Sequence, residues 1–364
     1  MEKCKKIINI NSMKTFYSIE LFAGAGGLAL GLEKANFQHI ALIEFDKNAA
    51  NTLLKNRPNW NVICDDIQVI SQKNLEQEFN IKQFDLDLLS GGAPCQSFSY
   101  AGKRLGLNDT RGTLFYYYAL FLQKLQPKMF LFENVKGLLN HDKGKTFKTI
   151  IDIFEQQNYY TYYKVLNAWN YNVPQKRERL ITIGIRKDLI TTNKTNNTNI
   201  SLFDIFKFPK EKKYKPVIKD IKLDINPNKN ECQSYSEYKK SIFKLVPAGG
   251  YWRDIDENIA KKYMKNSWGL KGGKTGMLRR ISLNEPSLTV LTSPSMKQTD
   301  RCHPLEIRPF SYRENARIQT FPDSWEFCGN LTEKYKQIGN AVPVNFAYEI
   351  GLEIANTLNI LTKK

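Results

Sequence analysis

The 364-residue sequence is poor in paired cysteines, in histidine and in long apolar runs. Its six cysteines are scattered without a Cys-x-x-Cys pair, which argues against a zinc site and against a dense disulfide framework. No apolar stretch approaches the length needed to span a membrane, and the first residues lack the apolar core of a secretion signal. These absences predict a soluble cytoplasmic protein with reduced thiols and no bound metal.

Acidic residues are too few to balance the basic ones. The chain has 54 Lys and Arg against 36 Asp and Glu, which gives a formal net charge of +18 at pH 7. An excess of this size makes a polyanion, and nucleic acid first, the leading class of partner. The alternative is that lysine only keeps a compositionally biased chain soluble.

The chain is longer than one hydrophobic core usually grows, so two domains are expected. From residue 16 to 186, short apolar runs alternate with amphipathic stretches, which predicts successive βα units and a mostly parallel α/β sheet with helices on both faces. The expected strands are 17–22, 39–44, 61–63, 84–90, 129–132, 160–166 and 180–185. The expected helices are 28–35, 47–56, 114–125 and 147–157.

The composition of the sequence changes after the last expected strand. A polar segment, 191–198, has the composition of a linker, and the part that follows is basic and irregular, with lysines among aromatics and glycines. This mixture suits loops that contact phosphates and base edges, and the alternative is a solvated lysine face. The tail, 337–361, is apolar again and is expected to pack on the first domain. We therefore predict one domain of residues 1–188 and 336–364 and a second of residues 189–335.

The first βα turn reads Phe-Ala-Gly-Ala-Gly-Gly-Leu at residues 22–28, and Glu44 stands near the end of the next strand. Glycines permit a tight turn and close backbone approach, and a carboxylate about 20 residues further on can bind both ribose hydroxyls. The pair indicates a cofactor that carries adenosine, but it does not separate NAD from S-adenosylmethionine. Asp66, after the third strand, is a candidate acceptor for the adenine amino group, or only a helix cap.

Three further motifs place reactive groups at the carboxyl edge of the expected sheet. Cys95 lies in Gly-Gly-Ala-Pro-Cys-Gln-Ser-Phe-Ser, and a thiol between a glycine turn and a proline is typical of a positioned nucleophile, the alternative being a buried thiol. Glu133 and Asn134 close another strand, where Glu133 is either catalytic or a capping carboxylate. Arg177 and Arg179 precede the last strand as functional cations or as part of a charged hairpin.

In their order, these motifs resemble those of the DNA cytosine-5 methyltransferases. The likeness includes a late motif at 308–323, with Arg-Glu-Asn-Ala-Arg-Ile-Gln-Thr-Phe-Pro-Asp, and Gly-Asn-Ala-Val-Pro at 339–343. It covers nearly the whole chain and fails only at about 190–275, where this family carries its variable target-recognition region. Ala93 departs from the family, in which proline is more usual, although only a backbone carbonyl is expected to act there.

The resemblance implies a Rossmann-like, S-adenosylmethionine-dependent methyltransferase fold for the first, catalytic domain. The second domain would be a smaller, irregular target-recognition domain that binds DNA. The Cys95 thiolate would add to C6 of a cytosine, with Arg177 as a positive neighbour. Glu133 would hold or protonate N3 and Arg179 would donate to O2, while Asn134 would organise the active-site loop.

Two sets of binding residues follow from the motifs and the resemblance. The expected cofactor-binding residues are Phe22, Gly24, Gly26, Gly27, Leu28, Glu44, Asp66, Ile67, Pro94, Asn340 and Ala341. The expected DNA-binding residues are Gln96, Ser99, Lys103, Arg104, Trp252, Arg253 and Arg279.

The predicted reaction transfers a methyl group from S-adenosylmethionine, leaving S-adenosylhomocysteine, to C5 of a specific cytosine in double-stranded DNA. The target nucleotide must leave the base stack to reach both the thiol and the cofactor. We expect a monomeric, protective methylase of a bacterial restriction-modification system, located at the nucleoid, with a cognate restriction endonuclease as its functional partner. The alternatives are a tRNA cytosine-5 methyltransferase and, more remotely, an NAD-dependent thiol oxidoreductase.

Overall fold

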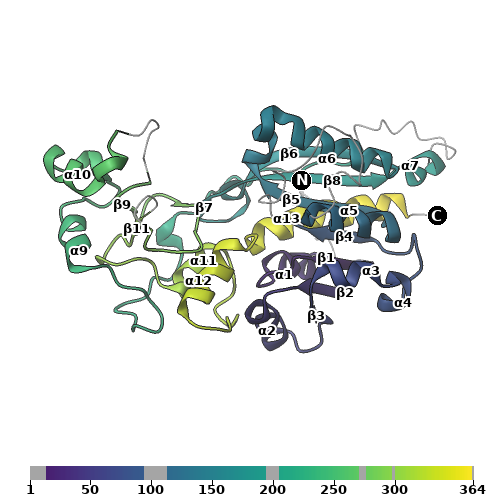
Figure 1. Ribbon diagram of the computed structural model, residues 1–364, viewed down its shortest axis with the longest axis horizontal. Coiled ribbons are helices and arrows are strands. Elements are labelled where there is room, and N and C mark those ends of the chain that lie inside the picture. The colour runs from purple at the N-terminus through teal and green to yellow at the C-terminus, as the bar shows by residue number, and fades with distance from the viewer. Residues whose placement is uncertain (1–13, 94–112, 194–204, 270–275, 297–299, 363–364) are drawn as a thin grey trace, which may run out of the picture.

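The computed structural model describes residues 14–93, 113–193, 205–269, 276–296 and 300–362. These residues form two lobes that lie next to each other along the long axis of the molecule (Figure 1). The larger lobe holds a central sheet covered by helices, and the smaller lobe consists of short helices joined by irregular segments.

The central sheet has seven strands in the order β3-β2-β1-β4-β5-β8-β6. They are β1 (Phe16–Leu21), β2 (Phe37–Glu44), β3 (Val62–Cys64), β4 (Leu88–Gly91), β5 (Met129–Val135), β6 (Tyr159–Asn167) and β8 (Glu178–Arg186). Neighbouring strands pair in parallel, except that β8 runs antiparallel to both β5 and β6. The predicted mostly parallel α/β sheet is confirmed, with one reversed strand.

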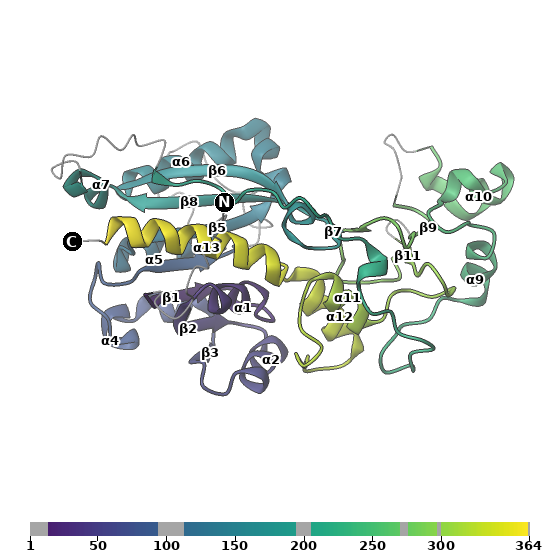
Figure 2. The same ribbon diagram turned by 180° about the vertical axis from the view of Figure 1, so that it is seen from behind.

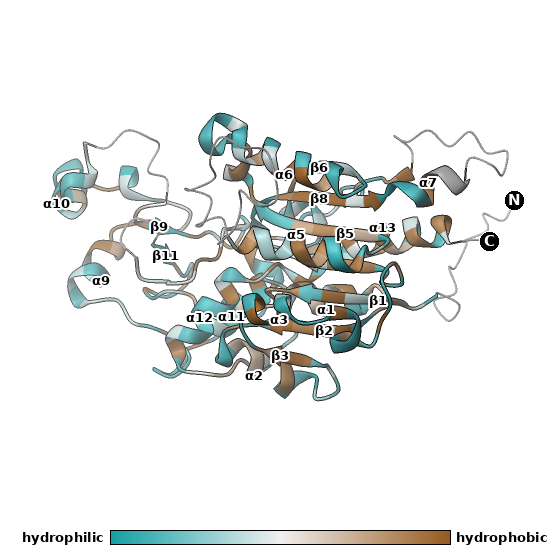
Figure 3. Ribbon diagram, turned by 45° about the vertical axis from the view of Figure 1, so that its right-hand side comes forward, coloured by the Kyte–Doolittle hydropathy of each residue, from teal (hydrophilic) through white to brown (hydrophobic). Residues whose placement is uncertain are grey.

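Helices cover both faces of this sheet, which explains why its central strands are mostly apolar (Figure 3). One face packs on α3 to α6 and the other on α1 and α13, the long helix that crosses the sheet in Figure 2. The helices of this lobe are α1 (Gly27–Lys34), α2 (Lys47–Asn56), α3 (Ile67–Gln72), α4 (Leu75–Phe79), α5 (Leu114–Leu125), η4 (Lys136–Gly144), α6 (Lys145–Gln156), η5 (Ala168–Tyr171), α7 (Lys187–Asn193) and α13 (Val344–Leu361). Among the helices in the described ranges, none combines the length and apolarity that crossing a lipid bilayer requires.

The structure differs from the sequence-based expectation mainly at strand ends. α2 and α5 have the expected bounds, whereas α3 and α4 lie where no element was expected. β4 begins four residues later than expected, because Phe84 has a φ of +75° and is half exposed, so that the chain still turns there. β5 continues to Val135 and β8 begins at Glu178. Glu133 and Arg179 therefore lie inside strands, which fixes their side chains more firmly than loop positions would.

The smaller lobe has its own apolar core, which includes Phe243, Met264, Leu278 and Cys302. Its elements are η7 (Ile218–Asp220), α9 (Glu237–Phe243), η8 (Trp252–Asp254), α10 (Glu257–Met264), η9 (Lys265–Ser267), β9 (Arg279–Arg280) and β11 (Arg301–Cys302). Between the lobes lie α11 (Tyr312–Ile318), α12 (Leu331–Asn340) and a parallel pair formed by β7 (Gln175–Lys176) and β10 (Ser287–Leu288).

Packing crosses the two expected domain boundaries. The Trp325 indole donates to the Ala25 carbonyl at 3.2 Å, and a third core cluster combines Trp325 with Leu53 of α2. On the other side, Phe206 belongs to the core cluster that α13 and the sheet form. The segments that lead into and out of the smaller lobe thus pack into the hydrophobic core of the larger lobe. The two lobes are therefore joined by hydrophobic contacts on both sides.

α1 and α13 approach each other closely because glycine and alanine face each other between them. A Cβ on Gly31 would lie 2.4 Å from the Ala347 Cβ and 2.7 Å from the Val344 carbonyl oxygen. On α13, a Cβ on Gly351 would lie 2.8 Å from the Ala35 Cβ. This contact holds the first turn of α1 in place, and that turn carries the glycine motif.

Replacing Gly31 with alanine is expected to lower the free energy of unfolding by about 1–3 kcal/mol, because the added methyl group forces the two helices apart. Thermal unfolding followed by circular dichroism measures the change. Gly137→Ala is the matched control, since a Cβ there meets nothing within 4 Å. A Gly31→Ala protein as stable as the natural one would contradict the close packing of α1 on α13.

Candidate active site at the carboxyl edge of the sheet

The turn after β1 leaves backbone groups open to a ligand. Phe22, Gly24 and Gly26 have φ values of +59°, +56° and +86°, so the chain reverses sharply before α1 begins at Gly27. A Cβ on Gly24 would meet nothing within 4 Å, which leaves open space over this part of the turn. The amino end of α1 points toward the same place, where its free N–H groups favour polar or anionic ligand atoms.

Glu44, the last residue of β2, is held against this turn. Its Oε2 accepts from the Gly24 N–H at 2.6 Å and its Oε1 accepts from the Asp46 N–H at 2.7 Å. Burial raises the pKa of Glu44, while the hydrogen bonds from Asp46 and Gly24 act in the opposite direction. The carboxyl group is therefore fixed in one orientation at the edge of the open space.

Phe45, which follows Glu44, is a residue that the sequence analysis missed. Its side chain is 74% exposed, the second largest value among the large apolar residues described as exposed. A ring this exposed contributes little to the core, and its position directly after Glu44 was a usable signal. The ring offers a flat apolar surface for an aromatic ligand.

Three other expected cofactor-binding residues have structural roles in the protein itself. Asp66 caps α3 by accepting from the Gln68 N–H at 2.8 Å, which confirms the capping alternative and leaves its role toward adenine a prediction. The side chains of Leu28 and Ile67 are buried in the two core clusters, so only their backbone atoms are available to a ligand.

The segment after α12 lies against the first turn of α1. A Cβ on Gly27 would be only 2.1 Å from the Val342 carbonyl oxygen. Asn340 is exposed, whereas Ala341 is buried and its carbonyl accepts from the Gln319 amide at 3.0 Å. The fold thus brings Asn340 and Ala341 beside the glycine turn, although they lie far from it in the sequence.

Glu133 and Arg179 form an ion pair at the same edge of the sheet. In the antiparallel β5-β8 pair, Arg179 lies opposite Val135, so its side chain reaches diagonally to Glu133 on the same face. The Arg179 Nε to Glu133 Oε1 distance is 2.8 Å, and both side chains are about six-sevenths buried, with 13% and 15% exposed. The pair is held in a largely dry position, where its charges act strongly.

The chain that leads from β4 toward Cys95 is fixed against this pair. A Cβ on Gly92 would lie 2.8 Å from Glu133 Oε2, so a larger residue here would displace the Glu133 side chain. Asn134 donates to the Ala93 carbonyl at 3.0 Å, and its own Oδ1 accepts from the Val135 N–H at 2.8 Å. These bonds agree with the role expected for Asn134, which stays a prediction. The expected residues Pro94, Cys95, Gln96, Ser99, Lys103 and Arg104 lie outside the described residues.

Arg177 is buried and binds backbone carbonyls of two distant segments. Its guanidinium donates to the Val290 oxygen at 3.3 Å and to the Gly339 oxygen at 3.1 Å. Burial, with a smaller contribution from Arg179, lowers the pKa of Arg177 to about 9, so it stays charged at neutral pH. Arg177, between β7 and β8, therefore ties the start of β8 to the chain between the lobes, and its expected action on Cys95 stays a prediction.

The three expected DNA-binding residues within the described part of the smaller lobe differ in exposure. Arg253 is exposed, and its guanidinium lies 4.9 Å from the Trp252 ring centroid. The Trp252 ring packs edge-on against Trp268 at 5.2 Å. Arg279 forms an ion pair with Glu285 at 2.6 Å, so its positive charge is partly neutralised within the protein.

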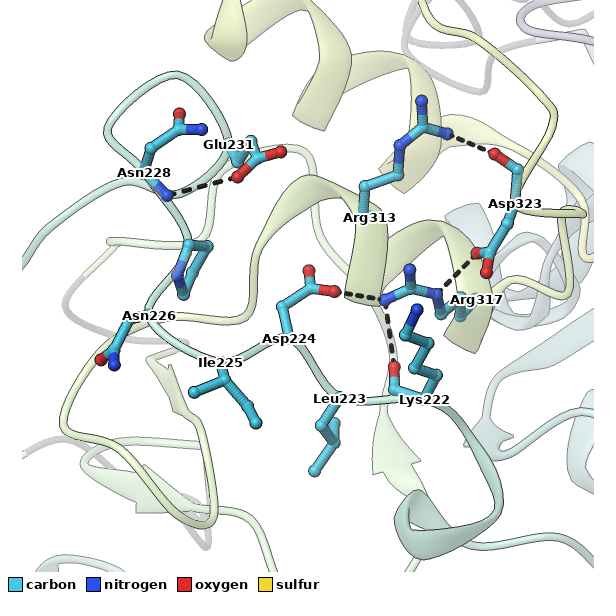
Figure 4. A pocket seen from close by; sticks show the side chains of 11 residues that line it. Lys222, Leu223, Asp224, Ile225, Asn226, Asn228, Glu231, Arg313, Arg317 and Asp323 are labelled. Carbon is cyan, nitrogen blue, oxygen red and sulfur yellow. Dashed lines mark hydrogen bonds and ion pairs between the residues drawn. The ribbon is translucent and has the colours of Figure 1, made fainter.

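A pocket of about 640 Å³ lies between the 222–228 segment and α11 (Figure 4). Arg317 joins its two walls by ion pairs of 2.6 Å to both Asp224 and Asp323. The charges in this pocket largely neutralise one another, and its lining includes neither Glu44 nor Glu133. Within the described ranges, no cluster of three or more His, Cys, Asp or Glu side chains is arranged to hold a metal ion.

Comparison with known proteins agrees with this geometry. Residues 16–356 match the family model of C-5 cytosine-specific DNA methylases. The chain is 52% identical to the Type II methyltransferase M.Sau96I of Staphylococcus aureus, over 97% of this chain and 79% of that protein. It is 47% identical to the Type II methyltransferase M.Eco47II of Escherichia coli, over 97% of this chain and 82% of that protein.

Solved structures support the same fold. A putative DNA modification methyltransferase encoded within a prophage of Escherichia coli superposes with a TM-score of 0.65, at 23% identity, over 95% of this chain and 100% of that one. The expected Rossmann-like methyltransferase fold is confirmed, and the alternatives of a tRNA methyltransferase and an NAD-dependent oxidoreductase are not supported. The chain belongs to the C-5 cytosine-specific DNA methylase family, and it is a DNA cytosine-5 methyltransferase.

Proposed function

We propose that this protein uses S-adenosylmethionine to methylate C5 of one cytosine within a specific duplex DNA sequence, through a covalent adduct between Cys95 and C6 of the base. The observation that carries the proposal is the Glu133–Arg179 ion pair, 2.8 Å long, beside the Gly92–Ala93 turn that leads to Cys95. The carboxyl group and the guanidinium offer a proton-holding group and a hydrogen-bond donor to the N3 and O2 edge of one ring, and the chain beyond Ala93 leads to the expected nucleophile, Cys95.

The crevice beside the glycine turn fits S-adenosylmethionine. The open space over Gly24 and the amino end of α1 provide N–H donors for its polar part. Glu44 has lone pairs left for ribose hydroxyls, and the exposed Phe45 ring would stack on adenine. When bound, S-adenosylmethionine supplies an electrophilic methyl group attached to a sulfonium.

The chemistry of cytosine explains why a thiol is needed. C5 of the aromatic ring is too weak a nucleophile to accept a methyl group directly, so the conjugation of the ring must first be interrupted. The Cys95 thiolate does this by forming a bond to C6, which moves electron density toward N3 and C5. Glu133 holds a proton at N3 as this charge develops, and Arg179 donates to O2.

The adduct then resolves without a permanent change to the enzyme. C5 gains the methyl group and still carries its proton, which a base must remove. The electron pair of that C–H bond re-forms the C5–C6 double bond and expels the Cys95 thiolate, and the proton held at N3 returns to Glu133. The hydrogen bond from Asn134 to the Ala93 carbonyl keeps the turn at one distance from Glu133 through both half-reactions.

The smaller lobe would bind the duplex and offset the cost of base flipping. Unstacking and unpairing one nucleotide costs roughly a few kcal/mol. The net charge of +18 favours contacts with phosphates, so the affinity for DNA is expected to fall steeply with salt. Each methyl transfer needs one active site, so a monomer suffices.

The biological role proposed is protection of DNA in a Type II restriction-modification system. Its support is that the two relatives above bear the name Type II methyltransferase and align with nearly the whole chain. A cognate restriction endonuclease would then be the functional partner. Methylation of every recognition site in the host DNA is what such a role requires.

Cys95→Ser is expected to abolish methylation, because a hydroxyl is a far weaker nucleophile toward C6 than a thiolate. Bisulfite sequencing of plasmid DNA from a host that expresses the natural protein should reveal one methylated cytosine in one short sequence. Plasmid from cells that express Cys95→Ser should show none. Unmodified plasmid from the natural, folded protein would overturn the proposed function.

Cys328→Ser is the matched control, since this partly exposed thiol belongs to no part of the proposed site. A duplex with 5-fluorocytosine at the target position, incubated with S-adenosylmethionine, gives a second readout, because after methyl transfer the C5 fluorine cannot leave as a proton does and the adduct persists. The natural protein and Cys328→Ser should form a complex that survives denaturing electrophoresis. A stable complex with Cys95→Ser would rule out Cys95 as the nucleophile.

Phe45→Ala is expected to weaken the binding of S-adenosylhomocysteine roughly 10-fold or more, since stacking of a base on an aromatic ring is worth about 1–3 kcal/mol. Isothermal titration calorimetry measures the dissociation constant directly. Phe84→Ala removes a half-exposed phenylalanine at the opposite edge of the sheet and should leave the constant unchanged. Equal affinities for all three proteins would show that Phe45 does not contact the cofactor.

Gly92→Ala is expected to lower kcat roughly 100-fold, because a displacement of about 1 Å in a catalytic group can have an effect of this size. The added Cβ would lie 2.8 Å from Glu133 Oε2 and would push the carboxyl group away from the base. Transfer of labelled methyl groups to DNA measures kcat, and S-adenosylhomocysteine affinity should stay normal. Gly137→Ala serves as the control, and an unchanged kcat for Gly92→Ala would contradict the placement of Glu133.

A further inference from the structure

Two buried glutamines meet where the lobes join, among β7, α11 and α12 (Figure 1). Gln175, in β7, and Gln319, directly after α11, are each 0% exposed. The Gln175 amide donates to the Gln319 Oε1 at 2.7 Å, although the two residues are 144 positions apart in the sequence. A buried amide that loses its partner is costly, so this bond fixes both side chains in one orientation.

Gln319 uses its amide donors on the turn after α12. Its Nε2 donates to the Ile338 oxygen at 2.7 Å and to the Ala341 oxygen at 3.0 Å. Carbonyl groups at the end of a helix need partners from outside the helix, and Gln319 supplies one here. The Val344 N–H, at the start of α13, donates to the Gln319 backbone oxygen at 3.0 Å. Gln319 therefore holds both ends of the turn from 339 to 343, which lies against the first turn of α1.

Gln175 holds the segment that leads to the catalytic strand. Its Oε1 accepts from the Val290 N–H at 2.8 Å, and the Val290 oxygen accepts from Arg177 at 3.3 Å. The N–H and the C=O of Val290 are thus both bound by side chains that lie just before β8. Arg179 follows Arg177 by two residues and forms the ion pair with Glu133. The position of Gln175 therefore affects the guanidinium that we propose to donate to the base.

Close packing around this junction leaves little room for rearrangement. A Cβ on Gly339 would lie 2.4 Å from the Leu291 carbonyl carbon and 2.5 Å from the Thr292 nitrogen. The chain after Val290 thus passes directly over the end of α12. Arg177 also donates to the Gly339 oxygen at 3.1 Å, so its charge lies at the carbonyl end of that helix, where a cation is favoured. Hydrogen bonds and close backbone contact together make the junction rigid.

We propose that Gln319 is a positioning residue for both substrates: it holds the 339–343 turn for S-adenosylmethionine and, through Gln175, the start of β8 for the target base. The inference rests on the proposed function, because it assumes that the cofactor lies beside the glycine turn and the base beside Arg179. Gln319 itself touches neither, since it is fully buried. It keeps the two binding surfaces at one distance from each other.

The test replaces each glutamine with methionine, which is also unbranched but has no amide group. Gln319→Met should weaken the binding of S-adenosylhomocysteine roughly tenfold, because the turn loses a buried hydrogen-bond donor. It should also lower kcat roughly tenfold or more, because Gln175 is released and the catalytic group shifts. Gln175→Met leaves the bonds from Gln319 to Ile338 and Ala341 in place. It should lower kcat to a similar extent and leave the affinity for S-adenosylhomocysteine unchanged.

Gln337→Met is the matched control. Gln337 is a buried glutamine of α12, and its side chain accepts from the Thr52 hydroxyl at 2.7 Å and donates to the Cys328 oxygen at 2.8 Å. These bonds resemble those of Gln319 but reach neither β7 nor the 339–343 turn. The variant should unfold at a lower temperature than the natural protein, with kcat and S-adenosylhomocysteine affinity unchanged.

Calorimetric titration with S-adenosylhomocysteine and transfer of labelled methyl groups to plasmid DNA at saturating cofactor measure the two quantities. Equal losses in Gln319→Met, Gln175→Met and Gln337→Met, in step with their unfolding temperatures, would show a merely structural role and overturn the proposal. If Gln319→Met does not fold, a natural kcat in Gln175→Met would still refute it. A natural protein that binds S-adenosylhomocysteine but does not methylate DNA would count against the proposed function instead.

Discussion

A buried hydrogen-bond network between the lobes is the constraint on which the rest of the structure depends. The Gln175 amide donates to Gln319 at 2.7 Å and accepts from the Val290 N–H at 2.8 Å, while Gln319 also donates to the Ile338 oxygen at 2.7 Å. Arg177 adds bonds to the same segments. Buried polar groups are costly unless partnered, so these bonds specify one arrangement of the chain between the lobes.

This network links the lobe that we propose to bind DNA with the proposed catalytic residues by a short path. Arg177 and Arg179 are two residues apart, so the strand that enters the network at one end meets Glu133 at the other. A movement of the smaller lobe on DNA would therefore be transmitted along the backbone and would shift the position of Arg179 relative to Glu133. The shared cores described above limit such a movement to small shifts, because packed interiors resist deformation.

Much of the fold was predictable because the sequence patterns that indicate strands, helices and turns extend over only a few neighbouring residues. Strand periodicity and the glycine turn indicated the parallel sheet and the place of Glu44, and the order of motifs indicated the reaction. The reversed β8 was not predictable, nor was the bond from Trp325 to Ala25, which joins residues 300 positions apart. Phe45 was within reach of sequence reasoning, because it directly follows Glu44 and belongs to no expected core.

The Glu133–Arg179 ion pair has a consequence for which bases the site can accept. Before DNA binds, each partner satisfies the other, so an incoming base competes with an existing bond instead of filling an empty place. In the proposed mechanism, cytosine repays the loss of that bond, because its O2 accepts from Arg179 and its N3 shares a proton with Glu133 as negative charge develops on the ring. Thymine presents the same O2, but its N3 already carries a hydrogen and its C5 a methyl group. With these proposed roles, the ion pair is an internal competitor that every entering base has to replace.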